Sequence, residues 1–298
     1  MAVDLHLHST KSDGTTTPQE VVRSGVSAGL SAIALTDHDN LDGIAEARAA
    51  AGSAGLGFIP GTELSVGWEG GAMHMLVYFL EPEPGPLQDR LRAVRDGRTA
   101  RNHEIVVALQ GLGIDISYEE VAAEAAGSGI GRPHIAAVLV SKGVVADIPA
   151  AFDRLLATGR PAYRPRLRLE VVEAIALARA SGAVPVIAHP HTLGIPEGGY
   201  REAFRELVDV GLGGIEAYYG EYTPELRSHL AALCDDLGIV ATGGSDYHGR
   251  YKPDLSVGIG RGDLEVPDAT VERLIDERDR PVVTGSSRRS ARRPIEPT

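Results

Sequence analysis

Apolar and polar side chains alternate with a period of two at the start of the chain. Residues 3–8 read VDLHLH, so valine and leucine are separated by aspartate and histidine. This period is typical of a strand with one apolar face. Because side chains two positions apart on a strand point the same way, we expect His6 and His8 to project together and bind one metal ion. The turn signal Asp13-Gly14 follows, where a carboxylate can be directed back to the same place.

Apolar runs and amphipathic segments continue to alternate up to about residue 84. Thr17 and Pro18 form a helix start, with threonine as the cap and proline at the first position. The run before Thr36 is almost continuously apolar, which favours a strand buried on both faces, as in a parallel sheet. The alternation predicts βα units. The expected elements are helices in 21–29 and 41–55 and strands in 30–40, 56–66 and 72–80.

Between about residues 85 and 168 we find no strand pattern, and this part is predicted to be a helical subdomain inserted into the βα series. Its expected helices cover 86–113, 117–127, 132–143 and 148–159. The βα pattern then resumes. Strands are expected in 184–191, 214–220 and 239–249, and helices in 169–182, 200–211, 223–238 and 269–278.

Counting gives seven expected strands in all. The predicted fold is therefore α/β: a distorted seven-stranded, TIM-barrel-like (β/α) barrel, one strand short of the (β/α)8 form, with an inserted helical subdomain. The barrel would comprise residues 1–84 and 169–285, and the insertion residues 85–168. Residues 286–298 contain four arginines. We expect this last segment to be a basic, disordered tail.

Composition narrows the class of protein. A chain of 298 residues that is 43% hydrophobic suits one large α/β domain with an insertion. The single cysteine, Cys234, fits a reducing compartment, and we find neither a basic-then-apolar leader nor a run of 18 apolar residues. The expected location is therefore cytoplasmic, without membrane association. The net charge of −12 argues against broad binding to duplex nucleic acid, although bound metals can still attract a phosphate locally.

Chemically active side chains recur where the predicted strands end. In barrels of this type, catalytic groups gather at the carboxyl ends of the strands. Imidazole and carboxylate together suit zinc, iron or manganese, and clustered divalent ions can generate hydroxide and polarise a phosphoryl oxygen. The residues at strand ends are His6, His8, Asp37, His38, Glu63, His189, His191, Asp246 and His248; His74 and Glu216 lie within strands, and His134 opens an insertion helix.

An ordered set of motifs resembles the PHP (polymerase and histidinol phosphatase) family of amidohydrolase-like metalloenzymes. The motifs are DLHLHSTKSDGTTTP, LTDHDNLDG, PGTELS, GRPH, AHPH and GGSDYHG, and they extend over nearly the whole chain. The resemblance implies a distorted seven-stranded barrel with up to three metal ions. SDG after the first motif, and GRPH in the insertion, look most like the branch of nucleotide 3′,5′-bisphosphate phosphatases. Some relatives in that branch trim RNA from its 5′ end.

The resemblance also implies a set of metal ligands, carried over position by position. His6, His8, Glu63 and Asp246 would hold one ion; Glu63, His74 and His134 a second, with Glu63 bridging; and Asp13, His38 and His248 a third. In several other branches of the family a histidine takes the place of Asp13, so occupancy by either two or three ions stays open. His189 is expected near the phosphate, as a ligand, an acid or a hydrogen-bond donor.

Arginines and tyrosines supply the candidate substrate contacts. Arg132 lies two positions before a proposed ligand, and a guanidinium can bind a phosphate bidentately; the alternative is a surface arginine that caps a helix. Arg164 and Arg166 are further candidates, with a solvated loop as their alternative. Tyr218, or its neighbour Tyr219, could stack on a base, or could simply be buried in its strand. One of the aspartates beside His38 is expected to orient its ring.

These patterns predict a metal-dependent phosphoesterase that uses a metal-bound hydroxide, since no nucleophilic Ser or Cys motif is apparent. The expected substrate is the 3′-phosphate of a nucleoside 3′,5′-bisphosphate or a short 5′-phosphorylated RNA. Three alternatives stay open. They are a phosphatase of another small phosphomonoester such as histidinol phosphate, an amide or lactone hydrolase, and a non-catalytic metal-binding module.

Overall fold

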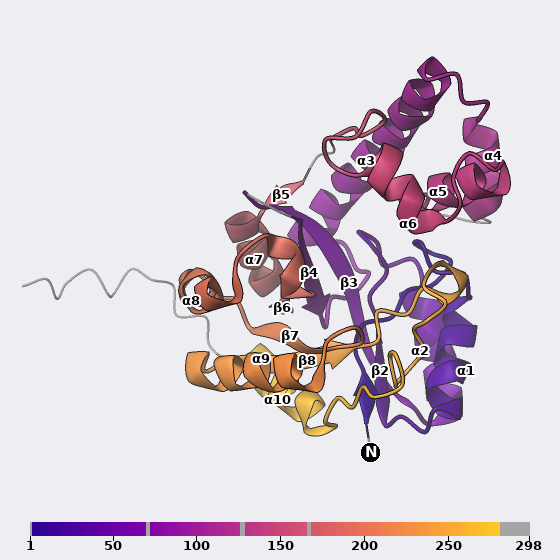
Figure 1. The fold of residues 1–298 in the computed structure, drawn as a ribbon. Helices are drawn as coiled ribbons and strands as arrows, with labels where there is room; N and C mark the ends of the chain where they lie inside the picture. The colour runs from indigo at the N-terminus through magenta and orange to yellow at the C-terminus, as the bar shows by residue number, and fades with distance from the viewer. Residues whose placement is uncertain (1, 70–71, 126–128, 166–167, 281–298) are drawn as a thin grey trace, which may run out of the picture.

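Seven strands form a nearly closed barrel, as the sequence predicts (Figure 1). The computed structural model describes residues 2–69, 72–125, 129–165 and 168–280. The last strand returns to the first, because the Leu5 amide donates to the Gly243 carbonyl over 3.1 Å and the Asp246 amide donates to the His6 carbonyl over 2.9 Å. In sheet order the strands are β1 (Val3–Asp4), β2 (Ala32–Leu35), β3 (Gly57–Gly67), β4 (Met73–Tyr78), β6 (Val184–Ile187), β7 (Gly214–Tyr219) and β8 (Val240–Gly244).

Strand β4 runs antiparallel to both of its neighbours, β3 and β6. The βα alternation is interrupted at this point, where the sequence predicts two strands, 56–66 and 72–80, with no helix between them. Only residues 68–72 connect β3 to β4, and a parallel crossover needs about a dozen residues or more. The hairpin makes β3 long enough to pair at its far end with the short strand β5 (Leu169–Glu170). Glu63 consequently lies inside a strand rather than at its end.

Helices cover the outside of the barrel, and short apolar side chains fill its interior. Val3, Leu5 and Ile59 are among the buried residues of the interior cluster, and Val186 and Val240 face them from the other side. Burying these side chains drives closure of the sheet. The covering helices are α1 (Pro18–Ser27), α2 (Ile44–Ala54), α7 (Val171–Ala180), α8 (Tyr200–Asp209), α9 (Pro224–Leu237) and α10 (Ala269–Asp279).

The insertion forms a helical lobe above the barrel (Figure 1). It consists of α3 (Pro86–Gly111), α4 (Tyr118–Ala125), α5 (Arg132–Ser141) and α6 (Ile148–Ala151), the last continued by a short π-helix, Phe152–Leu156. Helix α3 has 26 residues and is therefore about 39 Å long. Its first half packs Leu87 and Leu91 into the barrel's outer core, whereas Ile105 and Leu109 belong to the separate core of the lobe.

Among the described residues, no helix has both the length and the apolar character needed to cross a membrane. The proposed basic tail, residues 286–298, lies outside the described residues.

Candidate metal centre

The first two histidines of the chain meet just beyond β1. Their side chains are fully buried, and the two Nε2 atoms lie 3.1 Å apart. The expectation that His6 and His8 project together therefore agrees with the geometry. At this separation one ring nitrogen must either donate to the other or share a cation with it, since two lone pairs that face each other repel.

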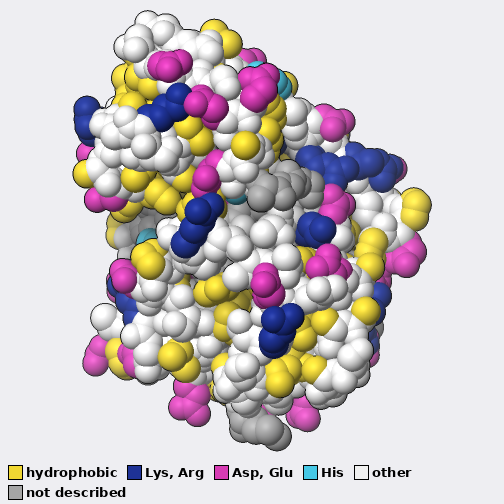
Figure 2. Space-filling view, turned by 90° about the vertical axis from the view of Figure 1, so that its right-hand side faces the viewer, with side chains coloured by type: hydrophobic (Ala, Val, Ile, Leu, Met, Phe, Trp, Pro, Cys, Tyr) yellow, Lys and Arg dark blue, Asp and Glu magenta, His cyan; other side chains and the backbone are white. Residues whose placement is uncertain are grey.

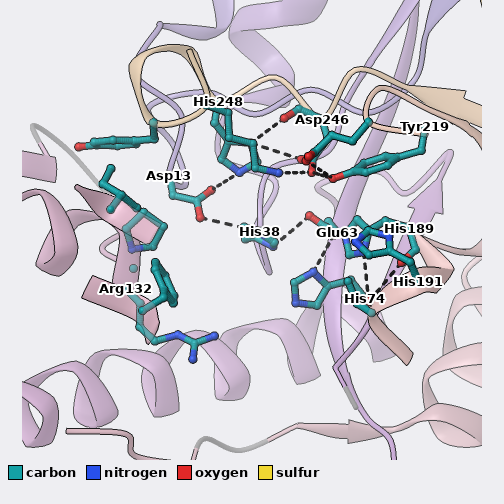
Figure 3. Close-up of a pocket in the computed structure, with 18 of the residues that line it drawn as sticks. Asp13, His38, Glu63, His74, Arg132, His189, His191, Tyr219, Asp246 and His248 are labelled. Atoms are coloured by element: carbon teal, nitrogen blue, oxygen red, sulfur yellow. Dashed lines mark hydrogen bonds and ion pairs between the residues drawn. The ribbon is translucent and has the colours of Figure 1, made fainter. Parts of the chain in front are cut away.

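Glu63 lies at the middle of the cluster, with 1% of its surface exposed. Its two oxygens serve different neighbours. Oε2 lies 3.1–3.2 Å from nitrogens of three histidines, and Oε1 lies 2.8–2.9 Å from nitrogens of two others (Figure 3). The first three are His6, His8 and His38, and the other two are His74 and His189. One carboxylate thus joins five imidazoles, which come from the ends of β1, β2 and β6 and from within β4.

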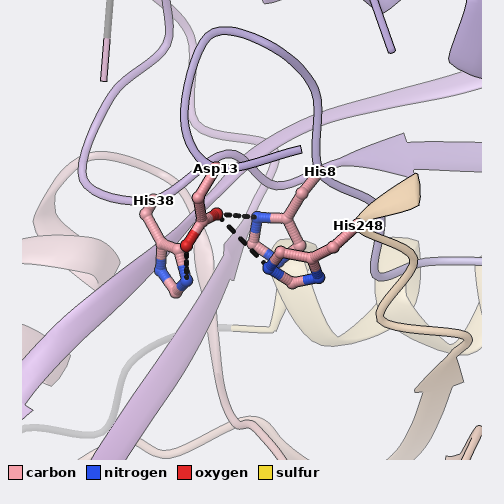
Figure 4. Close-up of side chains that lie close together, drawn as sticks. All are labelled: His8, Asp13, His38 and His248. Carbon is pink, nitrogen blue, oxygen red and sulfur yellow. Dashed lines mark ion pairs between the residues drawn. The ribbon is translucent and has the colours of Figure 1, made fainter. Parts of the chain in front are cut away.

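A second group surrounds Asp13, in the loop after the first strand (Figure 4). Its carboxylate oxygens lie 3.3 Å from His248 Nε2, 3.6 Å from His38 Nε2 and 3.7 Å from His8 Nδ1. The rings of His8 and His248 are stacked, with centroids 4.1 Å apart. The turn signal at Asp13-Gly14 therefore brings a carboxylate to the histidines, as the sequence suggests.

Asp246 closes the cluster from the end of β8. Its Oδ1 lies 3.3–3.5 Å from nitrogens of His6, His8 and His248. Its Oδ2 accepts a hydrogen bond from the Tyr219 hydroxyl over 2.8 Å and forms an ion pair with Lys252. The backbone at Asp246 has a positive φ of 54°, an uncommon conformation for a non-glycine residue that often marks a functional site.

The donor set fits divalent metal ions. Two buried atoms of this cluster, Asp13 Oδ1 and His38 Nδ1, have no well-directed hydrogen bond to the described residues, although ligand-type atoms surround both. A shared cation would satisfy such atoms, and nitrogen with carboxylate oxygen suits zinc, iron or manganese. Three groups of described residues are close enough to hold an ion. They are His6–His8–Glu63, His38–Glu63–His74 and His8–Asp13–His38–His248.

The protonation states of the cluster also favour the binding of cations. Burial alone would raise the pKa values of Asp13 and Glu63, but the surrounding imidazoles hold both well below the usual range, so the carboxylates stay ionised. Burial lowers the pKa of His38 to about 3, which keeps this ring neutral and able to act as a ligand. For His8, Asp246 and Glu63 outweigh burial and raise the pKa to about 9. A cation would replace that proton.

Further carboxylates hold the cluster in place from behind. Glu216 Oε1 lies 2.8 Å from His6 Nδ1, and its Oε2 accepts from the His189 amide over 2.8 Å. Asp37 accepts from the amide of Ser9 over 2.8 Å and from the hydroxyl of Ser12 over 2.5 Å, and so fixes the loop that carries Asp13. Sequence analysis gave no role to Glu216, although a glutamate inside an apolar strand was the available signal.

Asp37 and Asp39 flank His38, and the sequence predicts that one of them orients the His38 ring. Asp37 fixes the loop described above, and Asp39 accepts from the Ser65 amide over 3.0 Å and pairs with Arg98 of α3. Asp39 therefore ties the metal cluster to the lobe. The prediction that one of these two aspartates orients the His38 ring stays a prediction.

His134 does not join Glu63 and His74 as the resemblance implies. Its Nδ1 accepts from the Gly131 amide over 2.9 Å, and its ring meets Tyr251 edge-on with centroids 5.5 Å apart. Within the described residues, His38 takes the expected place beside Glu63 and His74. Helix α5 is the reason, because it begins at the side of the cavity near Asp13, where Gly131 lies.

A cavity of about 380 Å³ opens from the cluster and lies between the barrel and the lobe. Arg132 lines it, with its guanidinium donating to the Leu156 carbonyl over 3.2 Å and stacking over the Phe152 ring at 5.4 Å. Two arginines that sequence analysis missed, Arg98 and Arg101, also line this wall and are only 5–6% exposed. Their spacing of three on a helix was the available signal, since it places both on one face.

The other substrate candidates lie elsewhere. Arg164 donates to the carbonyls of its own loop, Pro161 and Tyr163, and is not part of the cavity wall; Arg166 lies outside the described residues. Tyr219, rather than Tyr218, lines the cavity.

The prediction for Tyr218 was wrong because of a register shift between Glu216 and Tyr218 in β7. Simple alternation would place residues 216 and 218 on the same face, and one extra residue reverses the face of everything after it. Tyr218 instead packs against the hydrophobic clusters.

Residues 4–130 match the PHP domain family. The chain is 31% identical over 257 residues to a 3′,5′-nucleoside bisphosphate phosphatase from Chromobacterium violaceum, covering 86% of this chain and 90% of that protein. It is 32% identical to a 5′-3′ exoribonuclease from Haemophilus influenzae, covering 82% and 89%.

Two solved structures share the fold over almost the full chain. A predicted metal-dependent phosphoesterase from Bifidobacterium adolescentis superposes with a TM-score of 0.82 at 30% identity, covering 92% of this chain and 96% of that one. An amidohydrolase from C. violaceum, with bound sulfate and no metal, gives a TM-score of 0.83 at 29% identity, covering 93% and 97%. With this barrel and this cluster of histidines and carboxylates, the chain belongs to the PHP domain family.

Proposed function

We propose that the protein is a metal-dependent phosphatase that removes the 3′-phosphate from nucleoside 3′,5′-bisphosphates. One observation carries the proposal: a buried cluster of imidazoles and carboxylates shares a single cavity with a wall of three arginines, Arg98, Arg101 and Arg132. The two parts suit the two phosphates of such a substrate. The similarity to a bisphosphate phosphatase over 86% of this chain supports the same conclusion.

The cluster would hold two or three ions of manganese, zinc or iron. Glu63 contributes to two of the three ligand groups and would bridge their ions, while Asp13 and His248 belong to the third. Asp246 would complete the group of His6 and His8. Bound there, divalent ions would polarise a phosphoryl oxygen and activate water for attack on phosphorus.

His189 is proposed to contact the phosphate that is cleaved. Its Nε2 lies 2.9 Å from Glu63 Oε1, and its backbone is held by Glu216 in a positive-φ conformation of 27°. The ring therefore has a fixed position at the edge of the cluster and lines the cavity. From there it can act as a ligand or as a hydrogen-bond donor to the phosphoryl group.

Arg132 is proposed to contact the phosphate that stays on the substrate. Its side chain is partly buried, and burial lowers its pKa from the usual value without neutralising it. A desolvated guanidinium forms strong, charge-assisted hydrogen bonds with an anion. Arg98 is already paired with Asp39, so it adds less net charge to the wall. Amide or lactone hydrolysis would give these arginines no purpose.

Short 5′-phosphorylated RNA is a second candidate substrate, favoured by the similarity to 5′-3′ exoribonucleases over more than four fifths of this chain. The face shown in Figure 2 carries interspersed acidic and basic side chains rather than one continuous basic surface. Together with the net charge of −12, this favours a small substrate over stable binding of a duplex. A nucleotide substrate also accords with the cytoplasmic location expected from the sequence.

Turnover assays with added manganese test the proposal. The substrates are adenosine 3′,5′-bisphosphate, 3′-AMP, histidinol phosphate and a 5′-phosphorylated short RNA. We expect the highest kcat/KM for the bisphosphate, with 5′-AMP and inorganic phosphate as products. Preference for histidinol phosphate, or hydrolysis of lactones without any phosphatase activity, would refute it.

A further inference from the structure

The cavity of about 380 Å³ that opens from the metal cluster is called the metal cavity below. A second hollow, of about 470 Å³, opens beside it. Residues 146–149, before and within α6, form one side, and residues 250–255, which follow β8, form the other. Figure 1 shows the loop after β8 rising toward α5 and α6. We call this hollow the side groove.

The side groove and the metal cavity are continuous. Four residues line both: Ile148, Glu221, Tyr251 and Lys252. Lys252 also pairs with Asp246, so its ammonium group lies where the groove meets the metal cluster. A molecule that extends from the cluster past Lys252 would therefore enter the groove directly.

The groove is amphipathic and close to electrically neutral. Pro149, Pro253, Leu255 and the ring of Tyr251 offer apolar contact surface. Three cationic and three acidic side chains also line it: Arg250, Lys252 and Arg261, and Asp147, Glu221 and Asp254. Arg261 pairs with Glu221 over 2.6 Å, and Arg250 pairs with Glu124 over 2.5 Å. Such a surface suits one nucleoside with a single phosphate rather than a long polyanion.

We propose that the side groove binds the nucleotide that follows the cleaved phosphate in a short oligoribonucleotide. This inference rests on the proposed function. A 3′-phosphomonoester and a 3′,5′-phosphodiester differ only in the substituent on phosphorus, which in the diester is the next nucleoside. The metal cavity would hold the 5′-terminal nucleotide in either case, and the groove would hold that substituent.

The chemistry at phosphorus is the same for both substrates. Water adds to phosphorus, the bond between phosphorus and O3′ breaks, and a proton passes to O3′. The products are a 5′-nucleotide with a free 3′-hydroxyl and either inorganic phosphate or an oligonucleotide with a new 5′-phosphate. One active site would thus serve both a bisphosphate and a short RNA, and the groove would determine how well the RNA is used.

Filling the groove tests the proposal. Ala146 is exposed, lines the groove and does not line the metal cavity, so Ala146→Trp should fill the groove without touching the metal cluster. The substrates are adenosine 3′,5′-bisphosphate and the 5′-phosphorylated dinucleotide pApA. We expect kcat/KM for pApA to fall about tenfold or more, as for loss of one base contact, with less than about a twofold change for the bisphosphate. Ala146→Leu should give an intermediate loss.

Ala123→Trp is the matched control, because Ala123 is exposed on α4 of the same lobe and lines neither hollow. It should leave both substrates unchanged. Equal loss for both substrates in Ala146→Trp, or no loss for pApA, would overturn the inference. So would a wild-type enzyme that hydrolyses the bisphosphate but not pApA, and in that case the proposed function would still stand. Failure of the wild type on both substrates would instead refute the proposed function itself.

Discussion

Glu216 Oε1 lies 2.8 Å from Nδ1 of His6, although the two residues are 210 positions apart in the chain. A carboxylate at this distance accepts the proton of Nδ1. With a cation bound in the cluster, the ring would then present the lone pair of Nε2 on the side of Glu63 and His8. A contact between strands β1 and β7 thus determines which nitrogen of His6 faces the cluster, and this is how a supporting carboxylate prepares a metal ligand.

Replacing Glu216 with alanine should weaken metal binding without removing any ligand. We expect about a 10- to 100-fold loss of manganese affinity, because the His6 ring loses its fixed tautomer and orientation. Titration of the metal-free variant by calorimetry measures the effect, and Glu216→Gln, which keeps a hydrogen-bonding group there, should recover part of it. Unchanged affinity in Glu216→Ala would show that Glu216 does not position His6.

Replacing Glu63 with glutamine should abolish most phosphatase activity and remove more than one ion per chain. Glu63 takes part in two of the ligand groups, and an amide supplies neither the charge nor the second anionic oxygen. Metal analysis by mass spectrometry and kcat/KM for the bisphosphate are the measurements, with circular dichroism as the check on folding. Full activity, or the loss of a single ion only, would contradict a bridging role.

Replacing Arg132 with alanine should lower kcat/KM more for a nucleoside bisphosphate than for a nucleoside monophosphate. We expect kcat/KM for adenosine 3′,5′-bisphosphate to fall roughly ten- to a hundredfold, as for the loss of a charge-assisted hydrogen bond of about 1.5–3 kcal/mol. 3′-AMP, which lacks the second phosphate, should lose much less. Arg164→Ala is the matched control, since Arg164 donates to the carbonyls of Pro161 and Tyr163 in its own loop and is not among the described residues that line the cavity. An equal loss for both substrates would mean that Arg132 does not recognise the second phosphate.

Adding manganese to protein treated with a chelator should raise its melting temperature. Glu63, Asp13 and Asp246 are buried and ionised, and a cation relieves their mutual repulsion in the folded state alone. At a hundred times Kd the expected stabilisation is about 2.7 kcal/mol. Differential scanning calorimetry measures it, and Glu63→Gln should show a smaller rise. An equal rise in the variant would place the stabilising ion away from this cluster.

Cys234 should be unreactive in the folded protein. It is completely buried in α9, and burial raises the pKa of its thiol to about 12. The reactive thiolate is therefore scarce as well as inaccessible at neutral pH. Ellman's reagent should detect no thiol at pH 8 in the native protein and one per chain in guanidinium chloride. Rapid labelling without denaturant would contradict this packing.

Sequence patterns predicted the structural features that depend on residues close together in the chain. The period of two placed His6 and His8 together, and the ends of the predicted strands pointed to Asp246 and His189, which lie in the same cluster. Features that depend on three-dimensional packing were harder to predict. No local pattern indicated that β4 runs backwards, or that one extra residue in β7 turns Tyr219 rather than Tyr218 to the cavity.

The position of the lobe relative to the barrel was the other feature that local patterns did not determine. His134 was assigned to Glu63 and His74 from its motif alone, whereas the direction of α5 decides where that ring lies. Arg98 and Arg101 were overlooked because α3 contains many arginines and the sequence does not show which of them face the cavity.

Helix α3 belongs to two hydrophobic cores at once. Leu87 and Leu91 pack with the barrel, and Ile105 and Leu109 pack with the lobe, on one uninterrupted helix. Excising residues 85–168 as a module would therefore strip apolar cover from the barrel wall and remove Arg98, which holds Asp39 beside the metal cluster. Any graft of a different lobe onto this barrel has to begin within α3, beyond Arg98, rather than at the Gly85 boundary. The helical lobe can therefore be exchanged only in a chimera that retains the first half of α3.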